Sequence, residues 1–207
     1  MAFQVPEHTY IFIDGEYLRR IHDEAMRDFF GVDGDLRKKE PRQKEVDILL
    51  ATDMLTHGFN GSMQKAVLLA GDLDFRPIVE ALVRHGVFVE VWYHRSSVAQ
   101  DLPGAADFGH VIRFRELYSW NSQHFQDAHR VPRDEENVGQ PRSEFLKAGS
   151  VKERYVQLYR FERSDGPIFQ LWIDTGGGTS ITISDADVDL IERYVAAQYA
   201  PVLWEVK

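Results

Sequence analysis

The chain has 207 residues, of which 43% are hydrophobic and 28% charged, a composition typical of a folded globular protein. Its formal net charge is −9, and both halves are acidic when the chain is divided after Trp120, which excludes a protein that binds nucleic acid by bulk positive charge alone. It has no cysteine, which excludes disulfides, thiolate metal ligands and cysteine nucleophiles.

The N-terminal segment predicts a strand and then a helix. Residues 9–14 are a short apolar run that ends in an acid, which is typical of a buried strand. Residues 15–28 predict a helix, because apolar side chains recur there at helical spacing, at Tyr17, Leu18, Ile21 and Ala25. Residues 29–44 contain glycine, proline and a basic cluster, so we expect a loop.

The next segment alternates helices with short apolar strands. We expect helices over 45–57 and 75–85, a short broken helical segment over 98–106, and strands over 66–70, 87–93 and 110–114. Such alternation is typical of βαβ units, so the predicted fold class is α/β, with a mainly parallel sheet flanked by helices over residues 1–120.

The C-terminal part predicts a second, smaller unit. Residues 121–150 are polar, and we expect a linker. Residues 151–207 predict a small α+β domain with three strands and one helix, at 154–161, 168–174, 179–183 and 185–199, the helix being capped by Ser184.

The N-terminus, MAFQVPEHTYIFID, lacks the basic and apolar regions of a secretory signal. No apolar run in the sequence approaches the roughly 20 residues that span a bilayer. We therefore expect a cytoplasmic protein without a membrane partner.

Aspartates follow two of the predicted strands. Asp14 ends the first strand, and Asp72 and Asp74 follow the second in the string AVLLAGDLDF. Because parallel strands end at the same edge of a sheet, we expect these acids to share that edge. Taken singly, an aspartate after a strand is most often a turn or helix-capping residue, and the shared edge is what favours a site.

Asp47 can reach the same edge through the long loop. The first helix carries the chain ~21 Å away, and the loop 29–44 could span ~50 Å if extended, so the second helix can begin beside the acids. The loop would also bring a basic cluster to guide a phosphate substrate, formed by Arg37, Lys38, Lys39, Arg42 and Lys44.

Clustered carboxylates repel one another unless a cation binds between them. Oxygen ligands suit Mg²⁺ or Mn²⁺, so we expect Asp14, Asp72 and Asp74 to bind the metal and Asp47 to bind it or orient a water molecule. A metal in such a site activates water for attack on a phosphodiester.

Four strings in this order resemble the NYN domain, a PIN-like ribonuclease fold. They are FIDGEYL, KEVDILLATDML, AVLLAGDLDFRPIVEALVRHGVFVEVW and LPGAADF, and the resemblance covers roughly residues 8–115. It implies a divalent-metal-dependent endoribonuclease that hydrolyses RNA, with Asp14, Asp47, Asp72 and Asp74 as the acidic site and Asp107 near it in a supporting role. Many members have Asn where this chain has Tyr17, and Ser where it has Ala70, and both positions concern substrate or water positioning.

Two other functions remain open. The Tyr17 and Ala70 departures leave room for a weakly active or inactive PIN-like scaffold that binds RNA or protein partners, although four retained acids argue against it. A metal-dependent phosphatase is a further alternative, although no phosphoryl acceptor other than the aspartates is evident.

The C-terminal unit has more apolar side chains than one helix covers. Alternation on its first two strands places about half of them on each face. We expect the second face to be buried against the nuclease domain or a second copy of the chain, and we favour a homodimer, because symmetric pairing is the commonest assembly. An RNA-binding surface is the competing interpretation, with aromatic side chains for stacking and basic residues at Lys152, Arg154, Arg160 and Arg163.

Overall fold

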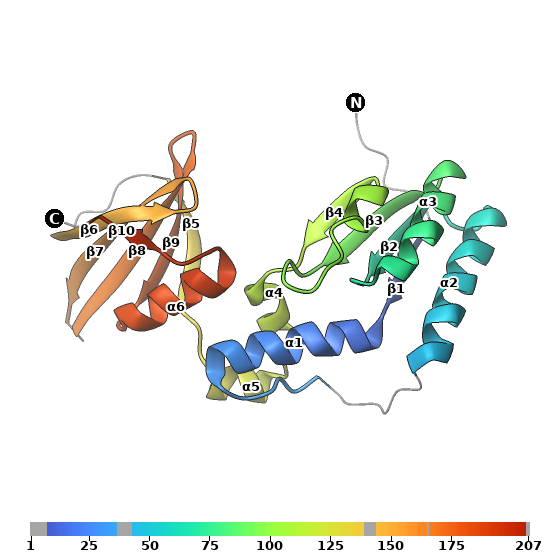
Figure 1. Cartoon of the computed structure of the whole chain (residues 1–207). Helices are drawn as coiled ribbons and strands as arrows, with labels where there is room; N and C mark the ends of the chain where they lie inside the picture. Colours follow the sequence, from blue (N-terminus) through green and yellow to red (C-terminus); the bar gives the residue numbers. More distant parts are fainter. Residues whose placement is uncertain (1–7, 37–42, 139–143, 165, 206–207) are drawn as a thin grey trace. The chain divides into compact units, whose positions relative to one another are not determined.

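A computed structural model describes residues 8–36, 43–138, 144–164 and 166–205 (Figure 1). The chain divides into two compact units, Met1–Ser122 and Gln123–Lys207. No helix in the described part of the chain is long and apolar enough to cross a membrane.

The first unit has the predicted α/β organisation. Its elements in chain order are β1 (Thr9–Ile13), α1 (Gly15–Phe30), α2 (Gln43–Phe59), β2 (Lys65–Leu69), the 3₁₀ helix η1 (Leu73–Phe75), α3 (Arg76–Arg84), β3 (Phe88–Tyr93), the 3₁₀ helix η2 (Pro103–Ala105), β4 (Phe108–Val111) and α4 (Phe114–Ser119). The strands form a four-stranded sheet in the order β1-β2-β3-β4, and every neighbouring pair is parallel. The predicted parallel sheet is confirmed, although the fourth strand begins at Phe108 instead of His110.

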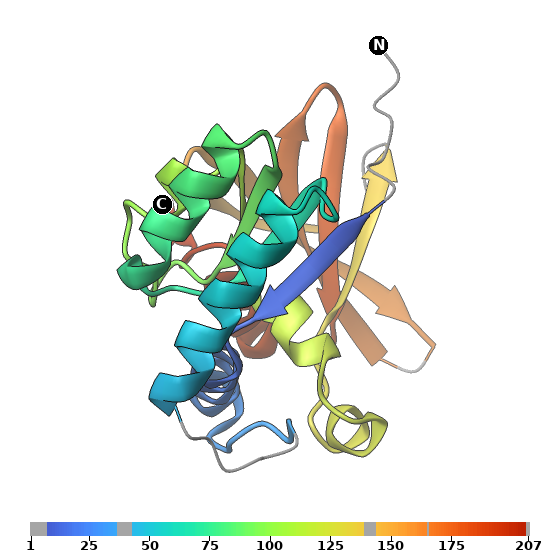
Figure 2. The same ribbon diagram turned by 90° about the vertical axis from the view of Figure 1, so that its right-hand side faces the viewer.

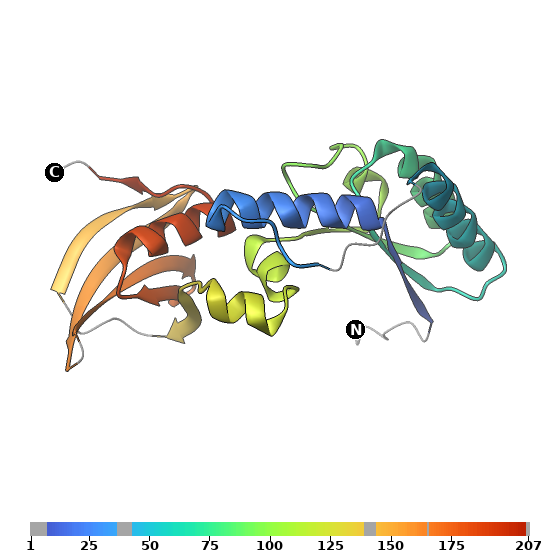
Figure 3. The ribbon, with the colours of Figure 1, turned by 90° about the horizontal axis from the view of Figure 1, so that it is seen from below.

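Helices α2 and α3 lie together over one face of this sheet (Figure 2). Met54 of α2 and Leu82 of α3 are fully buried in one cluster with Leu68 and Val89 of the strands. Helix α1 instead contacts α4 (Figure 3) through aromatic pairs, Phe29 with Phe114 and Phe30 with Tyr118. Burial of these apolar side chains holds the loops at the sheet edge in place.

The carboxyl edge of the sheet is held together by backbone hydrogen bonds. Asp14 N–H donates to Leu69 O (3.0 Å), which joins the end of β1 to the end of β2. Ala99 N–H donates to Gly71 O (3.0 Å), so the loop after β3 closes over the loop after β2. A Cβ on Gly71 would lie 2.1 Å from Tyr17 Cε2 and 2.3 Å from Ser97 O, so glycine is needed there for close packing.

The second unit is larger than we predicted. It contains α5 (Gln123–Ala128), β5 (Arg133–Val138), β6 (Glu144–Val151), β7 (Arg154–Arg163), β8 (Gly166–Gly176), β9 (Thr179–Asp185), α6 (Val188–Gln198) and β10 (Leu203–Trp204). These strands form a six-stranded antiparallel sheet in the order β10-β6-β7-β8-β9-β5. The three predicted strands are β7, β8 and β9.

The predicted linker over 121–150 is wrong, because β5 and β6 lie in it. Strand β5 is at the edge of the sheet, where a charged strand is tolerated since one side has no neighbour. Polarity alone therefore did not distinguish this strand from a linker.

Helix α6 covers one face of the second sheet. Its N-cap is Asp187, whose side chain accepts hydrogen bonds from the N–H groups of Asp189 and Leu190, and not Ser184 as we expected. Ile191 and Val195 of α6 are fully buried on this face.

Candidate active site

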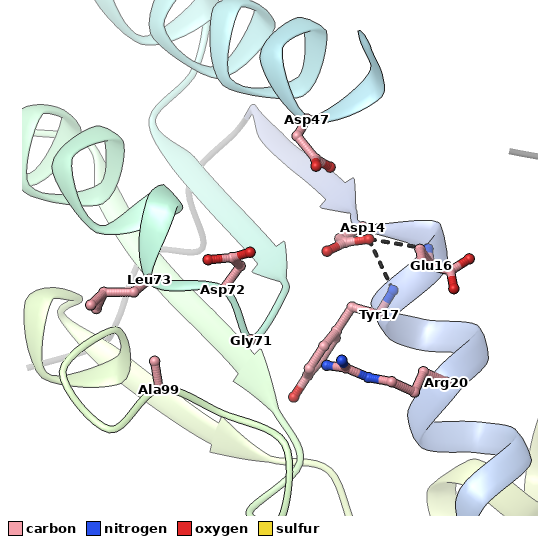
Figure 4. A pocket seen from close by; sticks show the side chains of 9 residues that line it. All are labelled: Asp14, Glu16, Tyr17, Arg20, Asp47, Gly71, Asp72, Leu73 and Ala99. Atoms are coloured by element: carbon pink, nitrogen blue, oxygen red, sulfur yellow. Dashed lines mark hydrogen bonds between the residues drawn. The ribbon is translucent and has the colours of Figure 1, made fainter. Parts of the chain in front are cut away.

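Three of the four predicted aspartates line one pocket at the carboxyl edge of the first sheet (Figure 4). Asp14 follows β1, Asp72 follows β2, and Asp47 lies near the start of α2. The pocket has a volume of about 320 Å³, and its lining is completed by Glu16, Tyr17, Arg20, Gly71, Leu73 and Ala99.

Asp14 and Asp72 are both helix N-caps. Asp14 Oδ1 accepts hydrogen bonds from Glu16 N–H (3.1 Å) and Tyr17 N–H (2.9 Å), and Asp72 Oδ1 accepts one from Asp74 N–H (3.0 Å). In the described part of the chain the second oxygen of each carboxylate accepts no hydrogen bond. The simpler interpretation of Asp14 and Asp72 as helix caps thus accounts for one oxygen of each carboxylate. The other oxygen of each is available to a ligand.

Asp47 lines the pocket, as the length of the predicted loop 29–44 allowed. Burial raises the pKa of its carboxyl group, and the charges of Asp14, Asp72 and Asp74 raise it further. Asp14, Asp72 and Asp74 are thus close enough to Asp47 for their charges to act on it.

Asp74 and Asp107 do not line the pocket. Asp74 is exposed in η1, and it acts on the site through its charge on Asp47 and its backbone N–H to Asp72. Asp107 Oδ2 accepts a hydrogen bond from Val89 N–H (2.8 Å), and Asp107 N–H donates to Val89 O (3.0 Å).

The expected position of Asp107 near the acids is therefore wrong. Val89 precedes Trp92, the residue level with the end of β2, by three positions along β3. That is roughly 10 Å along the strand. Asp107 joins the start of β4 to the start of β3, at the other end of the strands.

The predicted basic cluster is only partly within the described residues. Arg37, Lys38, Lys39 and Arg42 lie outside them, and Lys44 lies in the first turn of α2 without a described side chain. Their role in substrate binding stays a prediction.

Tyr17 and Ala70, the departures from the family pattern, are buried beside the acids. Tyr17 is 3% exposed, and its hydroxyl accepts a hydrogen bond from His94 N–H (2.9 Å). Ala70 is fully buried, and its N–H donates to Trp92 O (3.3 Å). Tyr17 therefore anchors the loop after β3 to α1.

Two charged residues of the pocket, Glu16 and Arg20, were not predicted from the sequence. Glu16 pairs with Arg19 at 2.5 Å, and this hydrogen bond lowers the pKa of Glu16. Arg20 also lines the pocket. The spacing of Glu16, Tyr17 and Arg20 is the signal that could have found them, because residues three and four apart share one helix face.

The donor set fits a hard cation with water in its shell. Among the described residues no three Asp, Glu or His side chains are arranged to hold one ion directly. Mg²⁺, however, keeps several waters and binds proteins through one or two carboxylates. Asp14 and Asp72 each offer an oxygen without a hydrogen bond, and Asp47 lines the same pocket.

A parallel α/β sheet with an acidic pocket at its carboxyl edge defines the class of this unit, and it is consistent with a PIN-like nuclease domain. Residues 32–113 match the family model of the NYN domain, which confirms the resemblance drawn from the sequence motifs. The match covers less than half of the chain, and it includes Asp47, Asp72 and Asp74 but begins after Asp14. Searches of the curated proteins and of the solved structures found no match.

Proposed function

We propose that the first unit is a divalent-metal-dependent ribonuclease that hydrolyses RNA phosphodiester bonds. The observation that carries the proposal is the pocket shared by Asp14, Asp47 and Asp72, which come from three separate elements. Four mutually repelling acids have a physical reason to be together when a cation binds among them. The NYN match supports a nuclease-related domain around the same residues.

Each acid has a distinct position for this chemistry. The uncapped oxygens of Asp14 and Asp72 would hold the metal, while the capping hydrogen bonds fix the orientation of both carboxylates. Bound Mg²⁺ or Mn²⁺ supplies polarisation of a phosphoryl oxygen and a lower pKa for a coordinated water. Asp47, whose pKa is raised, would accept a hydrogen bond from that water, and Asp74 would add negative charge from outside the pocket.

A catalytically weak RNA- or protein-binding scaffold is the second candidate. It is favoured by Tyr17, because the phenol hydroxyl is engaged with His94 N–H and the ring is buried, so this side chain does not offer the amide of Asn. The two functions differ in whether the acids turn over substrate.

Cleavage of single-stranded RNA decides between them. Wild type should cut RNA with Mg²⁺ or Mn²⁺ and leave it intact with EDTA, and Asp72→Asn should remove the cutting. Asp107→Asn is the matched control, because it removes one acid that does not line the pocket. Undiminished cutting by Asp72→Asn would indicate a contaminating nuclease, and RNA binding without cutting by wild type would favour the scaffold.

We further propose that the second unit pairs two copies of the chain through the sheet face opposite α6. Phe145, Tyr159 and Trp172 form a row on this face, with ring centroids 5.7 and 6.2 Å apart, and Phe145 is 46% exposed. The row is aromatic and lies across the three neighbouring strands β6, β7 and β8, and symmetric pairing is the commonest assembly.

Two of the three basic residues of β7 do not favour RNA on this face. Alternation places Arg154 and Arg160 on the face opposite Tyr159, whereas Arg163, the last residue of β7, shares the face of Tyr159. Arg160 also forms an ion pair with Glu162 at 2.5 Å. The aromatic row therefore lacks these two cations as phosphate contacts, and a second copy fits it better than a polyanion.

A further inference from the structure

Among the described residues that line the acidic pocket, Arg20 has the only basic side chain. It forms no ion pair in the described part of the chain, whereas Arg19, Arg27 and Arg76 are each paired with a nearby carboxylate. Figure 4 shows the Arg20 guanidinium beside the Tyr17 ring. Both residues lie on α1, the helix whose first N–H groups donate hydrogen bonds to Asp14. A charged donor group is therefore available in a pocket whose other charged groups, as far as the structure describes them, are acids.

The Tyr17 ring is a rigid support for this guanidinium. Arg20 Cζ lies 5.6 Å from the centroid of the ring, within the range of a cation–π interaction. The ring is fixed by burial and by the hydrogen bond from His94 N–H, and Gly71 leaves room for its edge. Tyr17 is only 3% exposed, so an RNA base cannot stack on its ring. The ring therefore contributes to the pocket by holding Arg20 in position.

Resting on the proposed function, we propose that Arg20 binds a non-bridging oxygen of the RNA backbone phosphate that enters the acidic pocket, and that Tyr17 positions it. The acids repel a phosphodiester, so the substrate needs a cationic contact of its own beside the metal. Arginine suits this role because its guanidinium stays charged and donates hydrogen bonds in a fork that matches phosphate. Arg20 is thus a substrate-binding residue, and Tyr17 is a positioning residue.

The charge of Arg20 has one alternative use, as a counter-charge that keeps Glu16 ionised. Its charge does lower the pKa of Glu16, although by less than that of Arg19 does. A counter-charge alone would change the affinity for Mn²⁺ and leave the affinity for RNA unchanged when the metal is saturating. The two uses are therefore separable by measuring metal and RNA independently.

The test compares Arg20→Gln and Arg20→Lys with Arg84→Gln, which removes one exposed charge at the last residue of α3, outside the pocket lining. Cleavage kinetics at saturating Mn²⁺ give KM and kcat, and titration calorimetry without RNA gives the Mn²⁺ affinity. We expect Arg20→Gln to lower kcat/KM by about 10- to 100-fold, the loss of one hydrogen-bonded charge contact. Arg20→Lys should fall between, and Arg84→Gln should match wild type.

Tyr17 supplies a second arm. Tyr17→Leu removes the ring and should raise KM, whereas Tyr17→Phe keeps the ring, loses the hydrogen bond from His94 N–H and should raise KM by less, with the melting temperature of each variant as the control for folding. The salt dependence of binding to a labelled oligoribonucleotide, followed by anisotropy, should lose about one phosphate contact in Arg20→Gln.

Three outcomes are informative. Equal kcat/KM for Arg20→Gln and Arg84→Gln would overturn the proposal, as would a change confined to Mn²⁺ affinity. If wild type cuts no RNA, the proposed function fails by itself. The anisotropy titration then still decides Arg20, since weaker RNA binding by about 10-fold in Arg20→Gln alone supports the phosphate contact and unchanged binding refutes it.

Discussion

Replacing Asp14 in two ways separates its structural role from its role in the site. Asp14→Ala removes the acceptor of two hydrogen bonds at the start of α1, at 3.1 and 2.9 Å. Loss of such a cap costs about 1 kcal/mol, which corresponds to a fall of about 4 °C in melting temperature for a domain of this size. Asp14→Asn keeps an oxygen acceptor of equal capping strength and removes only the charge.

The charge has the opposite effect on stability in the absence of metal. Asp14 is the neighbouring acid that raises the pKa of Asp47 most. Asp14→Asn should therefore melt at the wild-type temperature or slightly above it in EDTA. With Mn²⁺ at about 100 times its Kd, wild type should gain about 2.7 kcal/mol of stability, and the variant should gain less.

Differential scanning calorimetry in EDTA and in Mn²⁺, with RNA cleavage measured in parallel, checks both effects. Asp107→Asn is the control, because it lies away from the pocket and should keep the full Mn²⁺ response. If Asp14→Asn lost as much stability as Asp14→Ala in EDTA and kept the full Mn²⁺ response, Asp14 would be a cap and nothing more.

Four further predictions concern Asp47, Gly34 and Tyr159. The pKa of Asp47 is raised, and its protonated carboxyl group does not bind metal. Mn²⁺ affinity should therefore keep rising with pH above 3.8, the ordinary pKa of aspartate, and Asp47→Asn should make that rise smaller in a calorimetric pH series. Without metal, ionised Asp47 disfavours the folded state, so Asp47→Asn should melt higher than wild type at neutral pH, and this gain should vanish in acid; a constant difference at all pH values would contradict it. Gly34→Ala places a Cβ 2.0 Å from Cε1 of the buried His22 and should lower stability by about 1–3 kcal/mol in a denaturant titration, whereas Gly104→Ala meets open space and should not. Light scattering should show a dimer at micromolar concentration and a monomer for Tyr159→Glu, and a monomeric wild type would refute the proposed pairing.

Local pattern in the sequence was sufficient for the elements that the first unit uses. Apolar runs and helical spacing determine a strand or a helix within a few residues, so β1, α1, β2 and β3 agree with the prediction to within one or two residues. The parallel order of the strands then brings Asp14 and Asp72 to one edge without further information. The length of the loop 29–44 was enough to allow Asp47 to join them.

In the second unit, a polar sequence without a periodic apolar pattern was not sufficient to predict the secondary structure. Strand β5 has the sequence RDEENV, in which only the last residue, Val138, is apolar. It is a strand because β9 provides hydrogen-bond partners along its length, and β9 is distant in the sequence. No local signal in the chain carries that pairing.

Tertiary structure alone decided which charged side chains share the pocket. Asp74 and Asp107 were expected at the site by their motifs, but η1 leaves the first outside the pocket lining and the contact with Val89 holds the second at the far end of the strands. Arg20 was not expected, and it lines the pocket. The direction of a side chain depends on the turn of a helix and the packing of its neighbours, as Tyr17 depends on His94, 77 residues away. Residue type and spacing determined that acids meet at this edge, whereas packing between distant segments determined which of them face the pocket and which cation faces them.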